Sequence, residues 1–290
     1  MTTNLAVCAV AALAHAALAQ PTILVDASNP VTNGTDLPNG AVVTVVDGGV
    51  IGLSVDLSNG TLNIEGGEVA IGATSISSGF TNSNNTVNIS GGRVGPFFQF
   101  FNSDGNITGG ELDTFGVFSG STVTVSGGVV AGFPDVFSGG VVIIEGGSVN
   151  TVRALTGSTV ELIGTEFALN GQTIEIEVGE TVFLSERSQT LTATLADGSA
   201  FTHDLLPFDP GFPSPNVALA SATILLTRVE TACNPADLAA PLGFLDLADV
   251  DVFIAAFLSG DQAADLVTPF GFIDLSDVDA FIAAFLSGCP

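Results

Sequence analysis

Pairs of adjacent glycines recur at a nearly constant interval through the first half of the sequence, and this period constrains the fold more than any other feature. The pairs begin at Gly48, Gly66, Gly91, Gly109, Gly127 and Gly146, so a single spacing repeats closely, and only the interval from Gly66 to Gly91 is clearly longer. Each pair follows a short alternating or β-branched run, such as "TLNIEGGEV" or "STVTVSGGVV". Short strands that alternate with glycine at a fixed period are typical of a β-solenoid. The sequence therefore predicts a mainly β protein, a right-handed parallel β-helix with rungs of about 18 residues.

Phenylalanines follow the same period. Two series repeat at nearly the spacing of the glycine pairs: Phe97, Phe115 and Phe133, and Phe100, Phe118 and Phe137. Identical residues one rung apart stack along a solenoid, so we expect both series to pack in its interior. A binding groove lined by these rings is the alternative.

The glycine period divides the chain into four parts. Residues 1–19 are a short apolar run that ends in Ala-Leu-Ala, which predicts a secretory signal peptide cleaved before Gln20. Residues 20–171 form the predicted solenoid. Residues 172–231 lose the period but keep strand-like runs, which predicts a β-strand cap over the open end of the solenoid, followed by a linker. Residues 232–290 form a separate helical module.

The charge of the chain is strongly acidic. It contains 30 Asp and Glu residues against four arginines and no lysine, for a net charge of −26. This charge excludes the basic surface that nucleic-acid binding or adhesion to anionic lipid requires. No long apolar segment follows the signal peptide, so we expect no membrane insertion and a secreted or cell-surface location.

Many parallel β-helices resemble polysaccharide lyases or hydrolases, so the supply of reactive side chains tests an enzymatic role. Lyase chemistry needs a strong base beside carboxylates, but the chain has no lysine, and Arg93 and Arg153 stand apart. Hydrolysis needs two or three clustered carboxylates. The candidates Asp104, Asp113 and Asp135 lie after the glycine pairs or in nearby loops. We therefore expect the solenoid not to be an enzyme.

His203 is the single histidine that follows the predicted signal peptide. The sequence around it contains no recognisable Ser or Cys nucleophile. We expect it to be a surface residue or a hydrogen-bonded core residue of the cap.

The C-terminal region contains the same unit twice. Residues 237–260 and 265–288 are equivalent at an offset of 28 positions, and in each an apolar loop leads into a helix that ends at Gly260 or Gly288. Hydrophobic residues recur at i, i+3, i+4, i+7 and i+8: Val250, Phe253, Ile254, Phe257 and Leu258 in the first copy, and Val278, Phe281, Ile282, Phe285 and Leu286 in the second. This spacing predicts one apolar face on each helix, and we expect the two faces to pack together.

Two cysteines, Cys233 and Cys289, bracket the duplicated unit. In an exported protein, an even pair on either side of one small module predicts a disulfide bond that closes it. Two free buried thiols are the alternative.

The duplication, its spacing, the flanking cysteines and the terminal Gly-Cys-Pro resemble the GC-type dockerin domain-anchored proteins of planctomycete bacteria. The resemblance covers residues 233–290, about a fifth of the chain. It implies a dockerin-like module that binds a cohesin-like surface protein. Carried over to this sequence, the residues that contact the partner are Leu247, Ala248, Leu275 and Ser276.

The same resemblance implies calcium loops. The carboxylates that match the ligand positions are Asp237, Asp246 and Asp249 in the first copy, and Asp265, Asp274 and Asp277 in the second. Between them, however, "LAAPLGFL" and "LVTPFGFI" place apolar residues where polar ligands are expected. Calcium prefers six to eight oxygen ligands. Two possibilities therefore stay open, namely retained calcium and a metal-free loop held by packing of Pro, Gly and Phe.

The sequence as a whole predicts a secreted, non-catalytic β-solenoid that is anchored to a surface or extracellular scaffold by its C-terminal module. A dockerin-anchored, carbohydrate-active β-helix enzyme is the main alternative. An adhesin that binds a surface ligand such as an extracellular polysaccharide is the third possibility.

Overall fold

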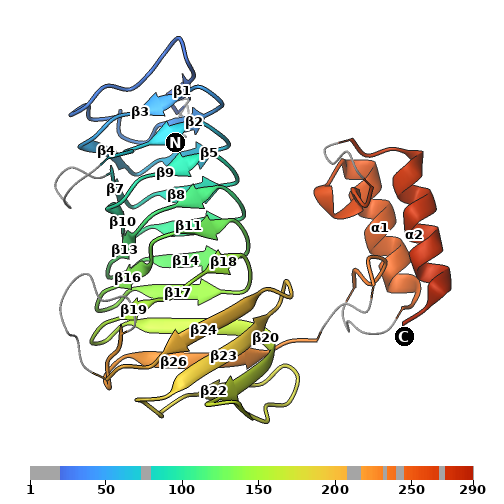
Figure 1. Cartoon of the computed structure of the whole chain (residues 1–290). Coiled ribbons are helices and arrows are strands. Elements are labelled where there is room, and N and C mark those ends of the chain that lie inside the picture. Colours follow the sequence, from blue (N-terminus) through green and yellow to red (C-terminus); the bar gives the residue numbers. More distant parts are fainter. Residues whose placement is uncertain are drawn as a thin grey trace, which may run out of the picture.

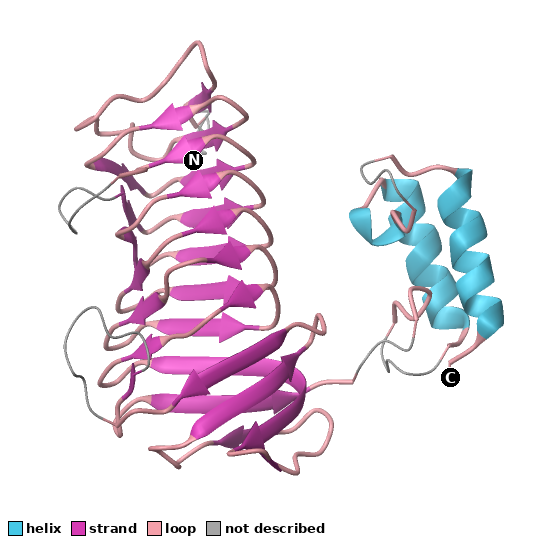
Figure 2. Cartoon of the chain, viewed as in Figure 1, coloured by secondary structure: helices cyan, strands magenta, loops and turns pink. Residues whose placement is uncertain are grey.

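A computed structural model describes residues 20–72, 80–207, 217–230, 234–239, 245–267 and 272–289. The protein is mainly β, with a parallel β-solenoid of about seven turns and two C-terminal helices, as the sequence predicts (Figures 1 and 2). The predicted signal peptide at residues 1–19 and Cys233 lie outside the described residues. The Cys233–Cys289 bond therefore stays a prediction.

Three parallel sheets run along the solenoid, and each of the central rungs contributes one strand to each sheet (Figure 1). The first sheet contains β1 (Thr22–Val25), β2 (Val42–Val45), β5 (Thr61–Ile64), β8 (Thr86–Ile89), β11 (Asp104–Ile107), β14 (Thr122–Val125), β17 (Val141–Ile144) and β20 (Thr159–Leu169). The second contains β4 (Val55–Ser58), β7 (Phe80–Ser83), β10 (Phe98–Phe101), β13 (Phe115–Val117), β16 (Pro134–Val136) and β19 (Arg153–Ala154). The third contains β3 (Val50–Ile51), β6 (Glu68–Val69), β9 (Arg93–Val94), β12 (Glu111–Leu112), β15 (Val129–Val130) and β18 (Ser148–Val149).

Side chains of the first sheet alternate between the core and the solvent face. In β5, Leu62 and Ile64 are fully buried, whereas Thr61 and Asn63 are half-buried on the outer face. Parallel pairing places Ile64 directly beside Ile89 of the next rung. Because strand side chains alternate between the two faces, this register repeats one buried column from rung to rung.

The glycine pairs occupy a turn of the rung, and two constraints act on them. Gly128 has a φ of +78°, in the left-handed region that side chains disfavour. Both glycines also lie against the preceding rung, since a Cβ atom would sit 2.4 Å from the carbonyl oxygen of Thr108 at Gly127 and 2.7 Å from that of Gly109 at Gly128. The left-handed backbone conformation and the close contact with the preceding rung together explain why glycine occupies both positions.

The aromatic series differ from the prediction in register. Phe98, not Phe97, pairs with Phe115, and in the following rung Pro134, not Phe133, lies beside Phe115. The half-buried series is Phe101, Phe118 and Phe137, whose rings stack with centroids 4.2 and 4.3 Å apart. The predicted register of Phe97, Phe100 and Phe133 was therefore wrong, because a short rung is followed by a longer one. Interior packing is confirmed for Phe100, Phe115 and Phe133, whereas Phe118 and Phe137 are only half-buried.

Antiparallel strands cover the C-terminal end of the solenoid. The long strand β20 continues beyond its rung and pairs with β21 (Gln172–Thr173) and β23 (Thr190–Leu195), and β23 pairs with β24 (Ala200–Asp204). The chain then returns to the stack. Two later strands pair in parallel with the last rung, namely β25 (Val217–Ala218) with β19 and β26 (Thr223–Arg228) with β20, while β22 (Thr181–Phe183) pairs with β26.

The C-terminal module has a hydrophobic core of its own. It contains α1 (Leu247–Ser259), a short 3-10 helix η2 (Gln262–Ala264) and α2 (Leu275–Ser287). The centre of this core is the pair Phe253 and Phe281, whose rings stack at 4.1 Å. Only part of each predicted apolar face is buried, since Ile254, Leu258, Ile282 and Leu286 are 48–79% exposed. Each α-helix packs against one other α-helix in the described module, so one side of the broad apolar stripe packs and the other faces solvent.

The close approach at the glycine turns is testable. Gly127→Ala should lower the free energy of unfolding of the solenoid by more than ~2 kcal/mol, because the new methyl group meets fixed backbone. The control is Gly171→Ala, whose φ is left-handed, unlike that of Gly127, but whose Cβ would enter open space. It should cost about 1 kcal/mol. Urea denaturation followed by circular dichroism measures both, and equal losses would contradict the close-contact explanation.

Candidate functional site

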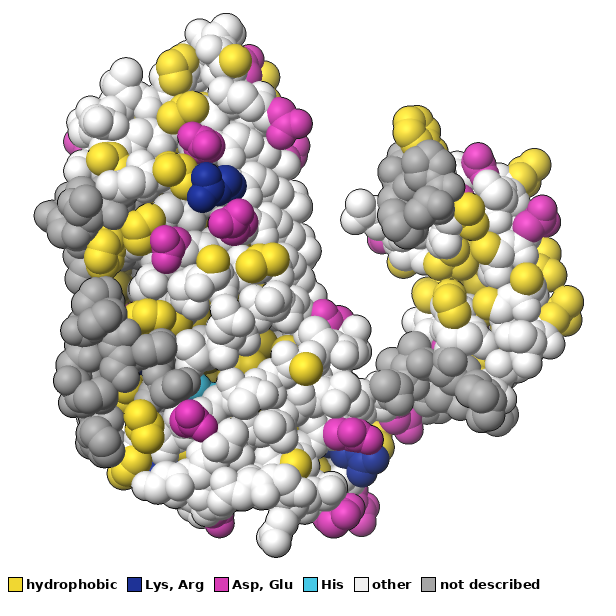
Figure 3. All heavy atoms as spheres, viewed as in Figure 1, with side chains coloured by type: hydrophobic (Ala, Val, Ile, Leu, Met, Phe, Trp, Pro, Cys, Tyr) yellow, Lys and Arg dark blue, Asp and Glu magenta, His cyan; other side chains and the backbone are white. Residues whose placement is uncertain are grey.

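A charged column lies on the third sheet of the solenoid. Glu68, Arg93 and Glu111 occupy the same register position on consecutive rungs. Arg93 Nε is 3.6 Å from Glu111 Oε2, and both side chains are about half exposed. Arg93, Glu111 and Asp113 border a hollow of about 240 Å³. Figure 3 shows basic and acidic side chains near one another on this face. The expectation that Arg93 stands apart was therefore wrong, because rung stacking brings it to two glutamates.

A buried ion pair joins two rungs of the second sheet. Arg153 Nη1 lies 3.0 Å from both carboxylate oxygens of Asp135, and only about a tenth of either side chain is exposed. Arg153 therefore does not stand apart either. The candidate carboxylates are not brought together, since Asp104 belongs to the first sheet, Asp113 follows the third, and Asp135 is held in this pair.

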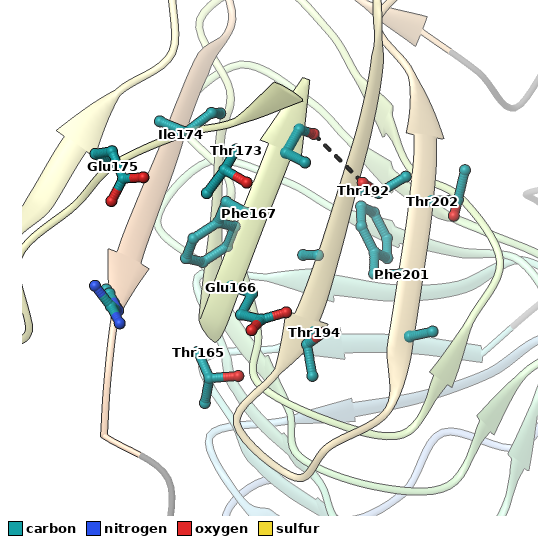
Figure 4. A pocket seen from close by; sticks show the side chains of 14 residues that line it. Thr165, Glu166, Phe167, Thr173, Ile174, Glu175, Thr192, Thr194, Phe201 and Thr202 are labelled. Atoms are coloured by element: carbon teal, nitrogen blue, oxygen red, sulfur yellow. Dashed lines mark hydrogen bonds between the residues drawn. The ribbon is translucent and has the colours of Figure 1, made fainter. Parts of the chain in front are cut away.

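The cap contains a larger hollow of about 430 Å³, formed by β20, β21, β23 and β24 with residues 174–175 and Arg228 (Figure 4). Its polar lining consists of five threonines, two glutamates and one arginine: Thr165, Thr173, Thr192, Thr194, Thr202, Glu166, Glu175 and Arg228. These hydroxyl, carboxylate and guanidinium groups are suited to hydrogen bonds with a polar ligand. The alternating run "TLTATL" signals a threonine-bearing face, but the pairing that closes the hollow depends on the extension of β20.

His203 is a core residue of the cap, on strand β24. Its side chain is 4% exposed, and Nδ1 lies 3.0 Å from Thr151 Oγ1. Burial among apolar side chains lowers the pKa of His203 to about 4, although the nearby Asp204 carboxylate acts in the opposite direction. The imidazole is therefore neutral at pH 7 and enclosed, which agrees with a structural role.

The aspartates of the C-terminal module bind backbone N–H groups. In the first copy, Asp249 accepts from Leu238 and Ala239 through Oδ1 and from Asp246 through Oδ2, at 2.7–2.8 Å. Asp246 in turn accepts from the backbone N–H of Ala248 at 2.6 Å. Asp246 is the N-cap residue of α1, and Asp249 completes a capping box.

The second copy repeats this arrangement. Asp277 accepts from Leu266 and Val267 through Oδ1 and from Asp274 through Oδ2, at 2.7–2.9 Å, while Asp274 caps α2. The remaining candidates, Asp237 and Asp265, stand directly before the loop residues that donate to these carboxylates. In the described residues, no three His, Cys, Asp or Glu side chains gather so that they could hold a metal ion.

The predicted partner-binding residues lie at the solvent-exposed starts of the two helices. Leu247 is 79% exposed and its counterpart Leu275 is 76% exposed, and Ala248 and Ser276 beside them are exposed as well. Large apolar side chains at such exposure gain nothing from burial within the chain. The structure thus places these four residues where another protein could contact them.

Comparison with models of protein families, with curated proteins and with solved structures found no match. Among the helices that the structure describes, none is long and apolar enough to cross a membrane. The inferences about function therefore depend on the geometry of the chain itself.

The buried ion pair provides a stability test. Asp135→Asn should lower the free energy of unfolding by about 3 kcal/mol, because it leaves the Arg153 charge buried without its counterion. Arg93→Gln, which breaks the exposed pair with Glu111, should cost less than about 1 kcal/mol. Chemical denaturation of both variants measures the difference. Similar losses would show that the pair on the second sheet is solvated.

His203 predicts a pH dependence of stability. Its folded pKa lies below the unfolded value of about 6.5, so the unfolded chain binds the extra proton and stability falls as the pH drops from 6.5 towards 4. Between pH 7.5 and pH 5 this residue should account for a loss of about 2 kcal/mol. His203→Asn should lose that much less over the same range in urea denaturation. An unchanged pH profile in the variant would mean that His203 is accessible to protons in the folded state.

Proposed function

We propose that this protein is an exported, non-catalytic β-solenoid that is anchored to a cell-surface or extracellular scaffold through its C-terminal helical module. The observation that carries the proposal is a set of apolar side chains that both helices expose at equivalent positions. In this proposal the solenoid is the cargo, the module is the docking element, and a cohesin-like surface protein is the partner.

The exposed residues match closely between the two copies. Their exposed fractions are 79% and 76% for Leu247 and Leu275, 49% and 48% for Ile254 and Ile282, and 79% for both Leu258 and Leu286. Within each helix the isoleucine and the second leucine lie seven and eleven positions after the first leucine, so the three side chains lie along one side of the helix. Contiguous exposed apolar surface marks interaction sites in soluble proteins. Two copies of one such stripe support a docking function.

Charged residues around the stripes indicate the chemistry of the partner. Asp246, Asp251, Asp274 and Asp279 are exposed on the same two helices, and the described module contains no basic side chain. The partner should therefore present an apolar patch bordered by Lys or Arg, because complementary charge at the rim steers association.

The arrangement of the solenoid carboxylates supports the non-catalytic part of the proposal. Asp135 is neutralised by Arg153, and Asp104 and Asp113 belong to different faces. Export is proposed from the apolar run at residues 1–19 and from the cysteine pair that brackets the module.

The threonine-lined hollow in the cap favours an adhesin as the second candidate function. Its hydroxyl groups and the carboxylates of Glu166 and Glu175 are suited to the hydroxyl groups of an extracellular polysaccharide. An anchored carbohydrate-active enzyme is the remaining alternative, with Glu111 and Asp113 beside the smaller hollow as its carboxylates.

The docking proposal is tested by capture with the full chain. Immobilised protein is incubated with a surface-protein extract, and the retained protein is then expressed and titrated against each variant. Leu247→Asp/Leu275→Asp should reduce affinity at least 100-fold, because each carboxylate loses its water without gaining a partner. Val50→Asp/Val129→Asp, which changes two exposed apolar residues of the solenoid, is the matched control and should bind normally. Loss of binding in the control alone would assign the interface to the solenoid.

A further inference from the structure

Each half of the C-terminal module closes around a negatively charged side chain. Asp249 has no exposed surface, and its carboxylate receives three backbone N–H groups within 2.8 Å. Two of the donors, Leu238 and Ala239, belong to the loop that precedes the helix, and the third is the N-cap residue Asp246. One carboxylate therefore ties the entry of the loop to the first turn of α1.

The second copy reaches the same arrangement with a different loop sequence. The donors to Asp277 are Leu266, Val267 and Asp274, in the same order and with the same division between Oδ1 and Oδ2. The loops "LAAPLGFL" and "LVTPFGFI" are identical at only half of their positions. Two sequences that give one hydrogen-bond pattern show that the pattern belongs to the fold of the unit.

The polarity of this arrangement is opposite to that of a calcium loop. A calcium loop directs carbonyl and carboxylate oxygens towards its centre, and the ion requires six to eight of them. Here the described loop residues direct N–H groups inwards, onto a carboxylate whose lone pairs they occupy. Asp246 and Asp274 are engaged as well, since each accepts a backbone N–H at the start of its helix. A cation at Asp249 or Asp277 would meet these inward-pointing N–H dipoles.

We propose that Asp249 and Asp277 replace the calcium ion as the groups that organise the two loops, so that the module folds without metal. Hydrogen bonds from N–H groups to a carboxylate are charge-assisted, and a negative charge in the first helical turn is favoured by the helix dipole. Four of the six residues that the resemblance to dockerins assigns to calcium are thus used as internal caps, namely Asp246, Asp249, Asp274 and Asp277. This inference concerns the folding of the module and holds whether or not the module binds a cohesin-like partner.

The ionisation of the two aspartates agrees with this role. The N–H of Asp274 and the two loop N–H groups hold the pKa of Asp277 below its ordinary value. For Asp249, burial acts to raise the pKa, but the three N–H donors outweigh it and the pKa is lowered as well. Both carboxylates are therefore charged at neutral pH and accept hydrogen bonds with both oxygens.

The test measures hydrogen exchange of α1 and α2 in the full chain by mass spectrometry, in 5 mM EDTA and in 5 mM calcium chloride. Asp249→Asn/Asp277→Asn replaces one accepting oxygen of each carboxylate by a donor. Asp251→Asn/Asp279→Asn, at exposed positions of the same helices, removes the same charge and is the matched control. We expect wild-type exchange rates to agree within twofold in the two buffers. The Asp249/Asp277 variant should exchange at least tenfold faster than the control in both.

Three outcomes would overturn the proposal. They are wild-type helices that lose protection in EDTA, saturable uptake of one or two calcium ions per chain in calorimetry at submillimolar calcium, and equal exchange in the two variants. A variant whose module does not fold at all supports it, provided that the control folds. None of these readings depends on partner capture, so a failed docking experiment leaves this result interpretable.

Discussion

Backbone hydrogen bonds between consecutive rungs are the interaction on which the solenoid depends. Every rung must copy the path of the previous one, because its N–H and C=O groups pair with those of its neighbours over the whole sheet. Gly127 shows the consequence, since any side chain there would collide with the carbonyl of Thr108. The rung that carries extra residues between β6 and β7 still pairs Ile64 with Ile89, so the added length does not change the register of the first sheet.

The same stacking decides where charges can lie. A column of like charges at the spacing of neighbouring strands, about 4.8 Å, would be repulsive. In the third sheet Arg93 separates Glu68 from Glu111, and in the second sheet Arg153 lies over Asp135. Two of the four arginines of this acidic chain thus lie where rung stacking would otherwise place two carboxylates side by side or bury one carboxylate without a counterion. Their role in the structure is electrostatic, and it explains their positions without catalysis.

The C-terminal module solves a different problem, because two short helices cannot enclose all of their apolar surface. Stacking of Phe253 on Phe281 provides a small core, and the buried Asp249 and Asp277 fix the loops that precede the helices. What remains is an apolar stripe on each helix that the described residues leave exposed. Internal hydrogen bonds thus stabilise the module, while part of its hydrophobic surface faces solvent.

The sequence by itself determined the solenoid and the two helices, because their signals are local periods of glycine, strand and helix residues. It did not determine which phenylalanines stack, since a short rung followed by a longer one averages to the same period. The threonine-lined hollow required the extension of β20, and the contacts of Asp249 required a loop folded back on its helix. Such features depend on register and on the direction of backbone N–H groups, and only the tertiary structure decides these because spacing along a chain does not record them.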